Sequence, residues 1–163
     1  MKLQELIDAS ELDMDIDQIK AFFLGVLCAE KPMNFAKTLE ELLSEVPEAK
    51  ASLEGELKKL WDELQGNVVK GLQGMFPANK DVKVFLETAQ NHLDYFLTSM
   101  SLSGTNSESA KNEELAELIE ELEDMIADFE EYLSDAKASK SDGDDFKEFL
   151  NETWAEYIES KKA

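Results

Sequence analysis

The sequence predicts an all-α fold, with about seven helices packed around a central apolar helix over residues 17–29. Apolar residues recur at three- and four-residue steps along most of the chain, which is the period of an amphipathic helix. No segment alternates apolar and polar residues as a half-buried strand does. Residues 21–29 carry no charge, although 33% of the chain is charged. A helix that is apolar on every side belongs in a protein interior, and this run is shorter than the roughly 20 residues of a membrane span.

Proline and asparagine residues mark where several predicted helices begin and end. The central helix begins near Asp15 or Asp17 and ends before Pro32, because the residue that precedes a proline avoids the α conformation. Asn34 is a candidate N-cap for the third helix. Pro47 ends that helix and is expected to open the fourth, since proline is tolerated in the first turn. The predicted helices cover residues 2–9, 17–29, 35–46, 47–68, 81–100, 112–138 and 144–158.

Two polar segments are predicted to join the later helices. Ser101–Ser109 is small and polar and contains Gly104, and residues 138–143 form a second polar linker. Neither linker differs enough in composition from the rest of the chain to indicate a boundary between two domains. A chain of 163 residues fits one domain and can bury a core of its own. We therefore expect a single all-α domain over residues 1–163.

The charge balance excludes several classes of partner. The chain has 37 acidic residues and 16 basic ones, a net charge of −21, and every basic residue is lysine. Binding of nucleic acid through its phosphates, and docking on an anionic membrane, both require a basic surface. We therefore expect no direct nucleic-acid binding and no membrane association. The single cysteine cannot form an internal disulfide, and the acidic N-terminus lacks a secretory leader, so the sequence predicts a cytoplasmic protein.

Three segments carry a resemblance to a known family. The run FLGVLCAE (Phe23–Glu30) resembles the GFLTGLLCA-type helix of the YgfB/YecA-like family of uncharacterised bacterial proteins. A second match begins at Phe76-Pro77, which is similar to that family's LP-containing acidic loop. It continues through Ala89 to the run YFLTSMSLSG (Tyr95–Gly104), which is similar to the family's WCQGFLLGLGLAG helix. The acid-rich run DDFKEFLNETWAEYI (Asp144–Ile158) follows the family's order of elements. The resemblance implies an all-α bacterial protein without an established enzymatic role.

The chain departs from the family pattern along the predicted fifth helix. His92 replaces the family's tryptophan, and Tyr95 and Ser99 replace its two glycines. These departures, two of which replace glycine by a larger side chain, lead us to expect looser helix packing there. The Cys/His extension that holds metal in some family members is also absent, so the resemblance implies no metal site.

Catalytic signatures are missing from the sequence, which contains no G-x-S-x-G, P-loop or G-x-G-x-x-G motif. Asp13, Asp15 and Asp17 begin like a calcium loop, but the required glycine and final glutamate are absent, so they are expected to lie at a helix N-terminus. His92 and Cys28 are expected to be structural, with His92 partly buried and Cys28 packed as a small apolar residue. We therefore predict a non-enzymatic protein without cofactor or metal.

The predicted sixth helix is the one segment whose composition indicates a function. Twelve acids and one lysine, Lys111, lie between Glu108 and Asp135. Like charges at this spacing destabilise an isolated helix, which indicates either a surface kept for solubility or one that attracts a basic partner. The candidate partner-binding acidic face consists of Glu113, Glu117, Glu120, Glu121, Asp124, Asp128 and Glu131.

Three functions remain open at the level of sequence. The first is a protein–protein interaction or regulatory adaptor module whose acidic face engages a basic protein. The second is a DNA mimic, in which the carboxylates occupy a basic nucleic-acid-binding protein. The third is a chaperone-like binder with an apolar groove, which would require a sizeable exposed apolar patch.

Overall fold

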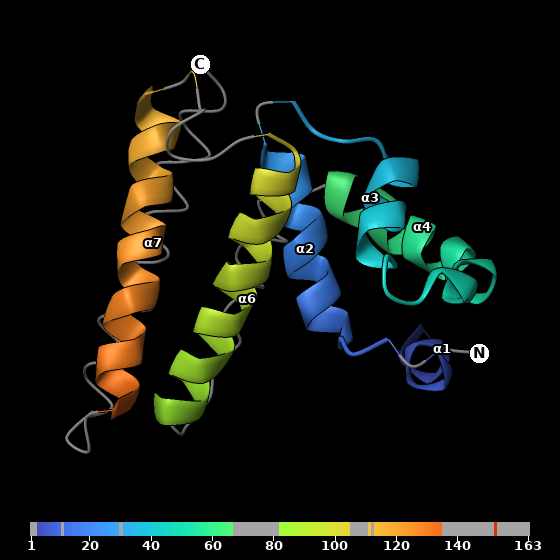
Figure 1. Ribbon diagram of the computed structural model, residues 1–163, viewed down its shortest axis with the longest axis horizontal. Coiled ribbons are helices and arrows are strands. Elements are labelled where there is room, and N and C mark those ends of the chain that lie inside the picture. The colour runs from blue at the N-terminus through green and yellow to red at the C-terminus, as the bar shows by residue number, and fades with distance from the viewer. Residues whose placement is uncertain are drawn as a thin grey trace.

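The computed structural model describes residues 3–10, 12–29, 31–66, 82–104, 111, 113–134 and 152, and these residues are almost entirely helical. They contain no strand, so the predicted all-α fold is confirmed. Of the predicted last helix, only Glu152 lies within the described residues, and it is helical. The elements are α1 (Leu3–Ala9), α2 (Ile16–Cys28), α3 (Phe35–Leu42), the 3₁₀ turn η1 (Pro47–Ala49), α4 (Lys50–Gly66), α6 (Val82–Leu102) and α7 (Glu113–Ser134), as Figure 1 shows.

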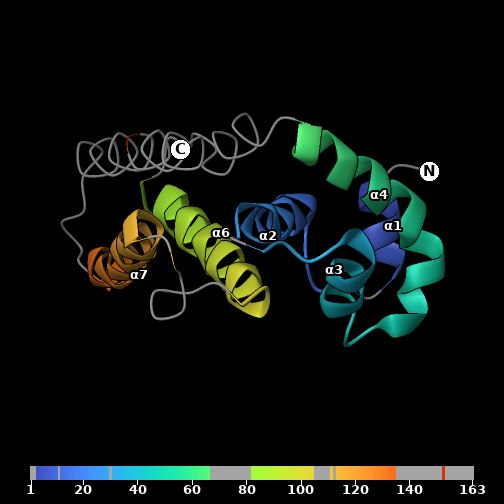
Figure 2. The same cartoon turned by 90° about the horizontal axis from the view of Figure 1, so that it is seen from above.

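Helices α2 and α6 form the middle of the molecule. They pack against each other more extensively than any other pair of described helices. Helix α7 lies on the far side of α6, and α1, α3 and α4 gather on the far side of α2, as both views show (Figures 1 and 2). The acidic helix α7 and the α3–α4 pair therefore lie at opposite ends of the molecule.

The predicted central helix is α2. Its N-terminus is closed by a capping box, in which the Gln18 N–H donates to Asp15 Oδ1 (2.8 Å) and Gln18 Oε1 accepts from the Asp15 N–H (3.0 Å). Every residue from Ala21 to Ala29 is buried, as is Ile19. The chain leaves the helix at Ala29 in an extended conformation. The absence of charge over residues 21–29 thus identified the centre of the core correctly.

Helices α2 and α6 approach each other closely at Gly25. A Cβ atom built on Gly25 would overlap Ser99 Oγ and the carbonyl oxygen of Phe96, and would lie 2.9 Å from the Phe96 carbonyl carbon. Ser99 is buried, and its hydroxyl donates to the Phe96 carbonyl oxygen (3.0 Å), which keeps the polar group satisfied inside the interface. The expectation of looser packing at this position is therefore wrong, because Gly25 provides the space that Ser99 fills.

Three aromatic rings join α2 to α3 and α4. The Phe23 ring meets the Trp61 ring edge to face, with centroids 5.3 Å apart and planes at 83°, and lies 6.4 Å from the Phe35 ring. The Phe35 and Trp61 rings are 5.7 Å apart. Edge-to-face pairs of this kind add to the stability gained by burial alone. The Lys58 ammonium lies 5.2 Å from the Phe35 ring centroid and covers the outer side of the cluster.

Two helix ends differ from the sequence prediction. Helix α3 ends at Leu42 rather than Val46, because Pro47 excludes the α conformation at Val46, and residues 43–46 form turns instead. Pro47 then opens η1, which leads directly into α4, as expected from its tolerance in a first turn. Helix α6 continues two residues into the predicted linker and stops at Leu102. Gly104 follows with a φ of 88°, a left-handed conformation that glycine adopts at little cost.

Replacing Phe23 by alanine is expected to lower the free energy of unfolding by about 3–5 kcal/mol, since it removes a fully buried ring at the centre of the core. Urea unfolding followed by far-ultraviolet circular dichroism measures this loss. Phe35→Ala serves as the control and should cost less, because Phe35 is only partly buried. A loss below about 1 kcal/mol for Phe23→Ala would show that the core lies elsewhere.

Gly25→Ala and Gly55→Ala are matched substitutions that should change stability in opposite directions. Both glycines lie inside helices, but a Cβ on Gly55 meets nothing within 4 Å. Gly25→Ala should destabilise the fold by about 1–3 kcal/mol through overlap with α6. Gly55→Ala should stabilise it by about 0.5–1 kcal/mol through helix propensity. The same urea titration tests both, and a neutral or stabilising Gly25→Ala would rule out the close approach.

Candidate functional site

Helix α7 packs against α6 through one apolar side and presents its acids on the other. Among its described side chains, Ile119 and Leu122 are buried, with relative exposures of 2% and 1%. The helix has 22 residues, of which ten are acidic and none is basic. Because α7 rests on α6 at one end of the molecule (Figure 2), its acidic side faces away from α6.

The seven residues of the candidate acidic face lie on one side of α7. With about 100° between successive residues of an α-helix, all seven fall within an arc of about 100° that is centred opposite the buried Ile119 and Leu122. From Glu113 to Glu131 the arc runs about 27 Å along the helix axis. The face is thus a single ridge of carboxylates rather than a scattered set.

Six of the seven side chains are described, and all six are exposed: Glu113, Glu117, Glu120, Glu121, Asp124 and Glu131. The backbone of Asp128 lies in α7, but its side chain lies outside the described residues. Glu123 is also exposed, on the flank of the ridge. Helical periodicity could assign these positions correctly because α7 is regular over its whole length.

The aspartates before α2 have a structural role. Asp15 is the N-cap of α2, as expected for an acidic residue at a helix N-terminus. Gln18, which completes the capping box, also donates through Nε2 to Asn91 Oδ1 on α6 (2.7 Å). The capping box therefore ties the start of the central helix to the middle of α6. The described residues contain no group of three or more His, Cys, Asp or Glu side chains able to hold a metal ion.

Cys28 and His92 both lie inside the core. Cys28 is buried among the apolar residues of α2, as predicted. His92 is more deeply buried than the expected partly buried position, with an exposed fraction of 3%. The periodicity of α6 alone places His92 at the edge of the apolar stripe. The extensive packing of α6 on α2 accounts for its deeper burial.

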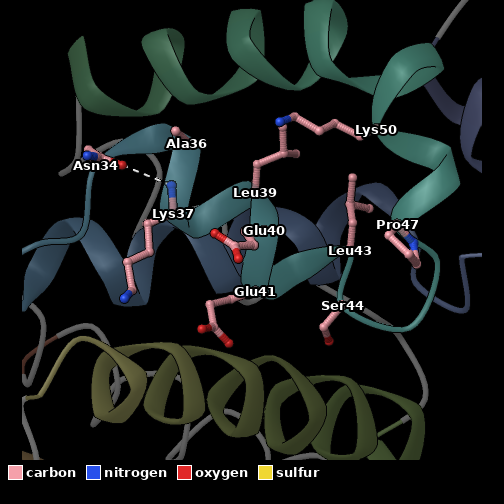
Figure 3. Close-up of a pocket in the computed structure, with 10 residues that line it drawn as sticks. All are labelled: Asn34, Ala36, Lys37, Leu39, Glu40, Glu41, Leu43, Ser44, Pro47 and Lys50. Atoms are coloured by element: carbon pink, nitrogen blue, oxygen red, sulfur yellow. Dashed lines mark hydrogen bonds between the residues drawn. The ribbon is translucent and has the colours of Figure 1, made fainter.

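A groove of about 690 Å³ runs over the outer side of α3 (Figure 3). Its floor contains Leu39 and Leu43, which are buried. Two lysines and two glutamates lie around it, namely Lys37, Lys50, Glu40 and Glu41. Sequence analysis missed this groove, because it forms only when the turn after α3 brings Pro47 and Lys50 back alongside the helix.

Tyr95 on α6 lies close to the acidic segment before α2. Its partial burial raises the pKa of the phenol above 10.0, and the negative charges of Asp13, Asp15 and Asp94 raise this pKa further. The Gln18–Asn91 hydrogen bond holds the start of α2 against α6, which agrees with the influence of Asp13 and Asp15 on the pKa of this phenol.

Within the described part of the chain, no helix is both long enough and apolar enough to cross a membrane. Comparisons with protein-family models, with curated proteins and with solved structures find no match to this chain. The functional inference therefore depends on the geometry of α7 and of the α3 groove.

The raised pKa of Tyr95 predicts an alkaline loss of stability. The native chain holds the phenolic proton more tightly than the unfolded chain, so stability should fall as the pH rises from about 10 through the native pKa. Absorbance at 295 nm during alkaline titration, taken as the difference between wild type and Tyr95→Phe, isolates this phenol. Tyr95→Phe should remove the part of the stability loss at alkaline pH that comes from ionisation of this phenol.

Asp13→Asn should move the Tyr95 titration back toward pH 10, whereas Glu54→Gln on α4 removes one charge elsewhere and should leave it nearly unchanged. A Tyr95 titration at or below pH 10 in the wild type would contradict the arrangement of these aspartates around the phenol.

Proposed function

We propose that this protein is a non-enzymatic interaction module, a regulatory adaptor whose acidic face on α7 binds a basic surface of a partner protein. The observation that carries the proposal is the ridge of exposed carboxylates on a helix that contains no basic residue. The resemblance of the sequence to the YgfB/YecA-like family agrees with a helical protein that lacks an enzymatic role. We also propose that the protein uses no cofactor and does not bind nucleic acid directly.

The carboxylates of the ridge repel one another. Glu117 has acidic neighbours three and four positions further on, at Glu120 and Glu121, and both of these are followed in the same way by Asp124. Each such pair destabilises an isolated helix by about 0.2–0.5 kcal/mol. A basic partner would remove this repulsion and gain the attraction of several charges at once. A charged ridge of this kind also speeds association at low ionic strength and gives binding that weakens with added salt.

A DNA mimic would use the same ridge but would require its carboxylates to match the spacing of DNA phosphates. Seven carboxylates along about 27 Å give roughly one charge per 4.5 Å of axis, whereas each DNA strand carries one per 3.4 Å and the duplex carries two strands. We therefore favour a basic protein surface in general over a DNA-binding groove in particular. Competition by duplex DNA for the captured partner distinguishes the two.

The chaperone-like alternative receives less support from the described residues. Val84 and Leu102 are the large apolar side chains exposed among them. They are 18 residues apart on α6, which separates them by about 27 Å along the helix axis. Two isolated side chains do not form the contiguous patch that such a binder requires.

Affinity capture from a lysate of the source organism, at low and at high salt, tests the proposal when two variants accompany the wild type. The first neutralises the ridge through Glu117→Gln, Glu120→Gln, Glu121→Gln and Asp124→Asn. The second removes the same charge elsewhere through Glu45→Gln, Glu48→Gln, Glu54→Gln and Glu63→Gln, all exposed. We expect a basic partner that the wild type and second variant retain at low salt and that the ridge variant binds about tenfold more weakly.

Neutralising the ridge should leave α7 folded, because it removes like-charge pairs, and circular dichroism confirms this. Equal weakening by both variants would show that only net charge matters. Retention of the partner at high salt by the ridge variant would show that the partner binds elsewhere.

A further inference from the structure

The groove over α3 has a different composition from the acidic ridge of α7. It contains Lys37 and Lys50 together with Glu40 and Glu41, so its charges balance in a chain whose net charge is −21. It lies at the opposite end of the molecule from α7 (Figure 1). The groove is therefore a separate surface from the acidic ridge. An inference about the groove does not depend on the function proposed for the ridge.

The four charged side chains of the groove differ from the two lysines of α4 in their ion pairing. None of the four side chains forms an ion pair with another described residue, although on α4 both Lys58 and Lys59 do so, with Asp62 and Glu56 at 3.0 Å. Figure 3 shows the Lys50 side chain extended toward Leu39, and the Glu40 carboxylate on the other side of Leu39. An ammonium group and a carboxylate group thus stand on either side of the buried Leu39 and are open to a ligand.

Neutral polar and apolar groups complete the groove. Asn34 caps the N-terminus of α3, where its side-chain Oδ1 accepts a hydrogen bond from the Lys37 N–H (2.9 Å). Its amide NH₂ therefore remains a donor at the edge of the groove, on the side away from Lys37 (Figure 3). Ala36 and Pro47 are exposed and provide apolar walls. A groove of about 690 Å³ falls in the size range of ligand sites in proteins.

We propose that this groove binds a short peptide segment that carries one acidic and one basic side chain. The acidic group of the peptide pairs with Lys50, and its basic group pairs with Glu40 or Glu41. Small apolar atoms of the peptide cover the walls formed by Ala36 and Pro47. With the acidic ridge of α7 at the other end, the module has two binding surfaces that face different partners.

The test uses the full chain labelled with ¹⁵N and a set of acetylated, amidated hexapeptides. Each peptide contains one lysine and one glutamate in an alanine background, separated by zero to three residues in either order. Control peptides replace both charged residues by glutamine. We expect at least one peptide of the set to shift the backbone resonances of Ala36, Glu40 and Ser44 at millimolar concentration, and the uncharged controls not to do so.

Substitutions in the groove identify the paired charges. Lys50→Gln and Glu40→Gln should each weaken the binding of that peptide about two- to fivefold, the effect of one exposed ion pair. Lys31→Gln and Glu54→Gln are the controls, exposed residues outside the groove, and should leave the affinity unchanged. Both groove variants should still capture the partner of α7, and the ridge variant should still bind the peptide.

Three results would overturn the proposal. The first is that no peptide of the set shifts resonances of the groove at about 5 mM, since a weaker interaction is no longer a site. The second is equal binding by wild type, Lys50→Gln and Glu40→Gln. The third is a set of shifts centred on α7 instead, which would mean that only the basic residue of the peptide is recognised.

Discussion

The close approach of α2 and α6 at Gly25 is the constraint on which the rest of the structure depends. Residues 21–28 of α2 are buried on all sides, so this part of the helix can neither carry charge nor tolerate a void. The missing side chain at Gly25 lets the α6 backbone come near enough for Ser99 to enter the interface with its hydroxyl satisfied by Phe96. The Gln18–Asn91 hydrogen bond fixes the same two helices nearer the start of α2. Together these contacts define a rigid pair on whose two sides the other described helices pack.

This arrangement separates the two surfaces to which we assign binding. Among the described helices, α7 makes its major contact with α6, and its exposed acids lie on the side away from that contact. On the other side of α2, the aromatic contacts of Phe23 hold α3 and α4 in place and thereby position the groove over α3. The central pair thus supports an acidic ridge at one end and a groove of balanced charge at the other, and these are the two surfaces to which the proposed binding is assigned.

Much of this fold could be predicted from the sequence, because its helices are regular and its core is marked by the absence of charge. The uncharged run at residues 21–29, the Asn34 cap, the Pro47 turn and the phase of the α7 acids all follow from local rules. Properties that depend on two elements at once could not be predicted. The depth of His92, the fit of Ser99 against Gly25 and the groove between α3 and Lys50 each arise from tertiary packing, on which the local pattern of one helix carries no information.

Carboxyl-group footprinting of the wild-type chain, with and without its captured partner, tests the central claim most directly. Carbodiimide coupling of a small amine labels exposed acids, and mass spectrometry reads the labelling at each residue. The account predicts that the partner protects Glu117, Glu120, Glu121 and Asp124 while the exposed acids of α4, Glu54 and Glu63, keep their labelling. Unchanged labelling along α7 in the complex, with protection confined to other elements, would contradict the assignment of α7 as the partner-binding face.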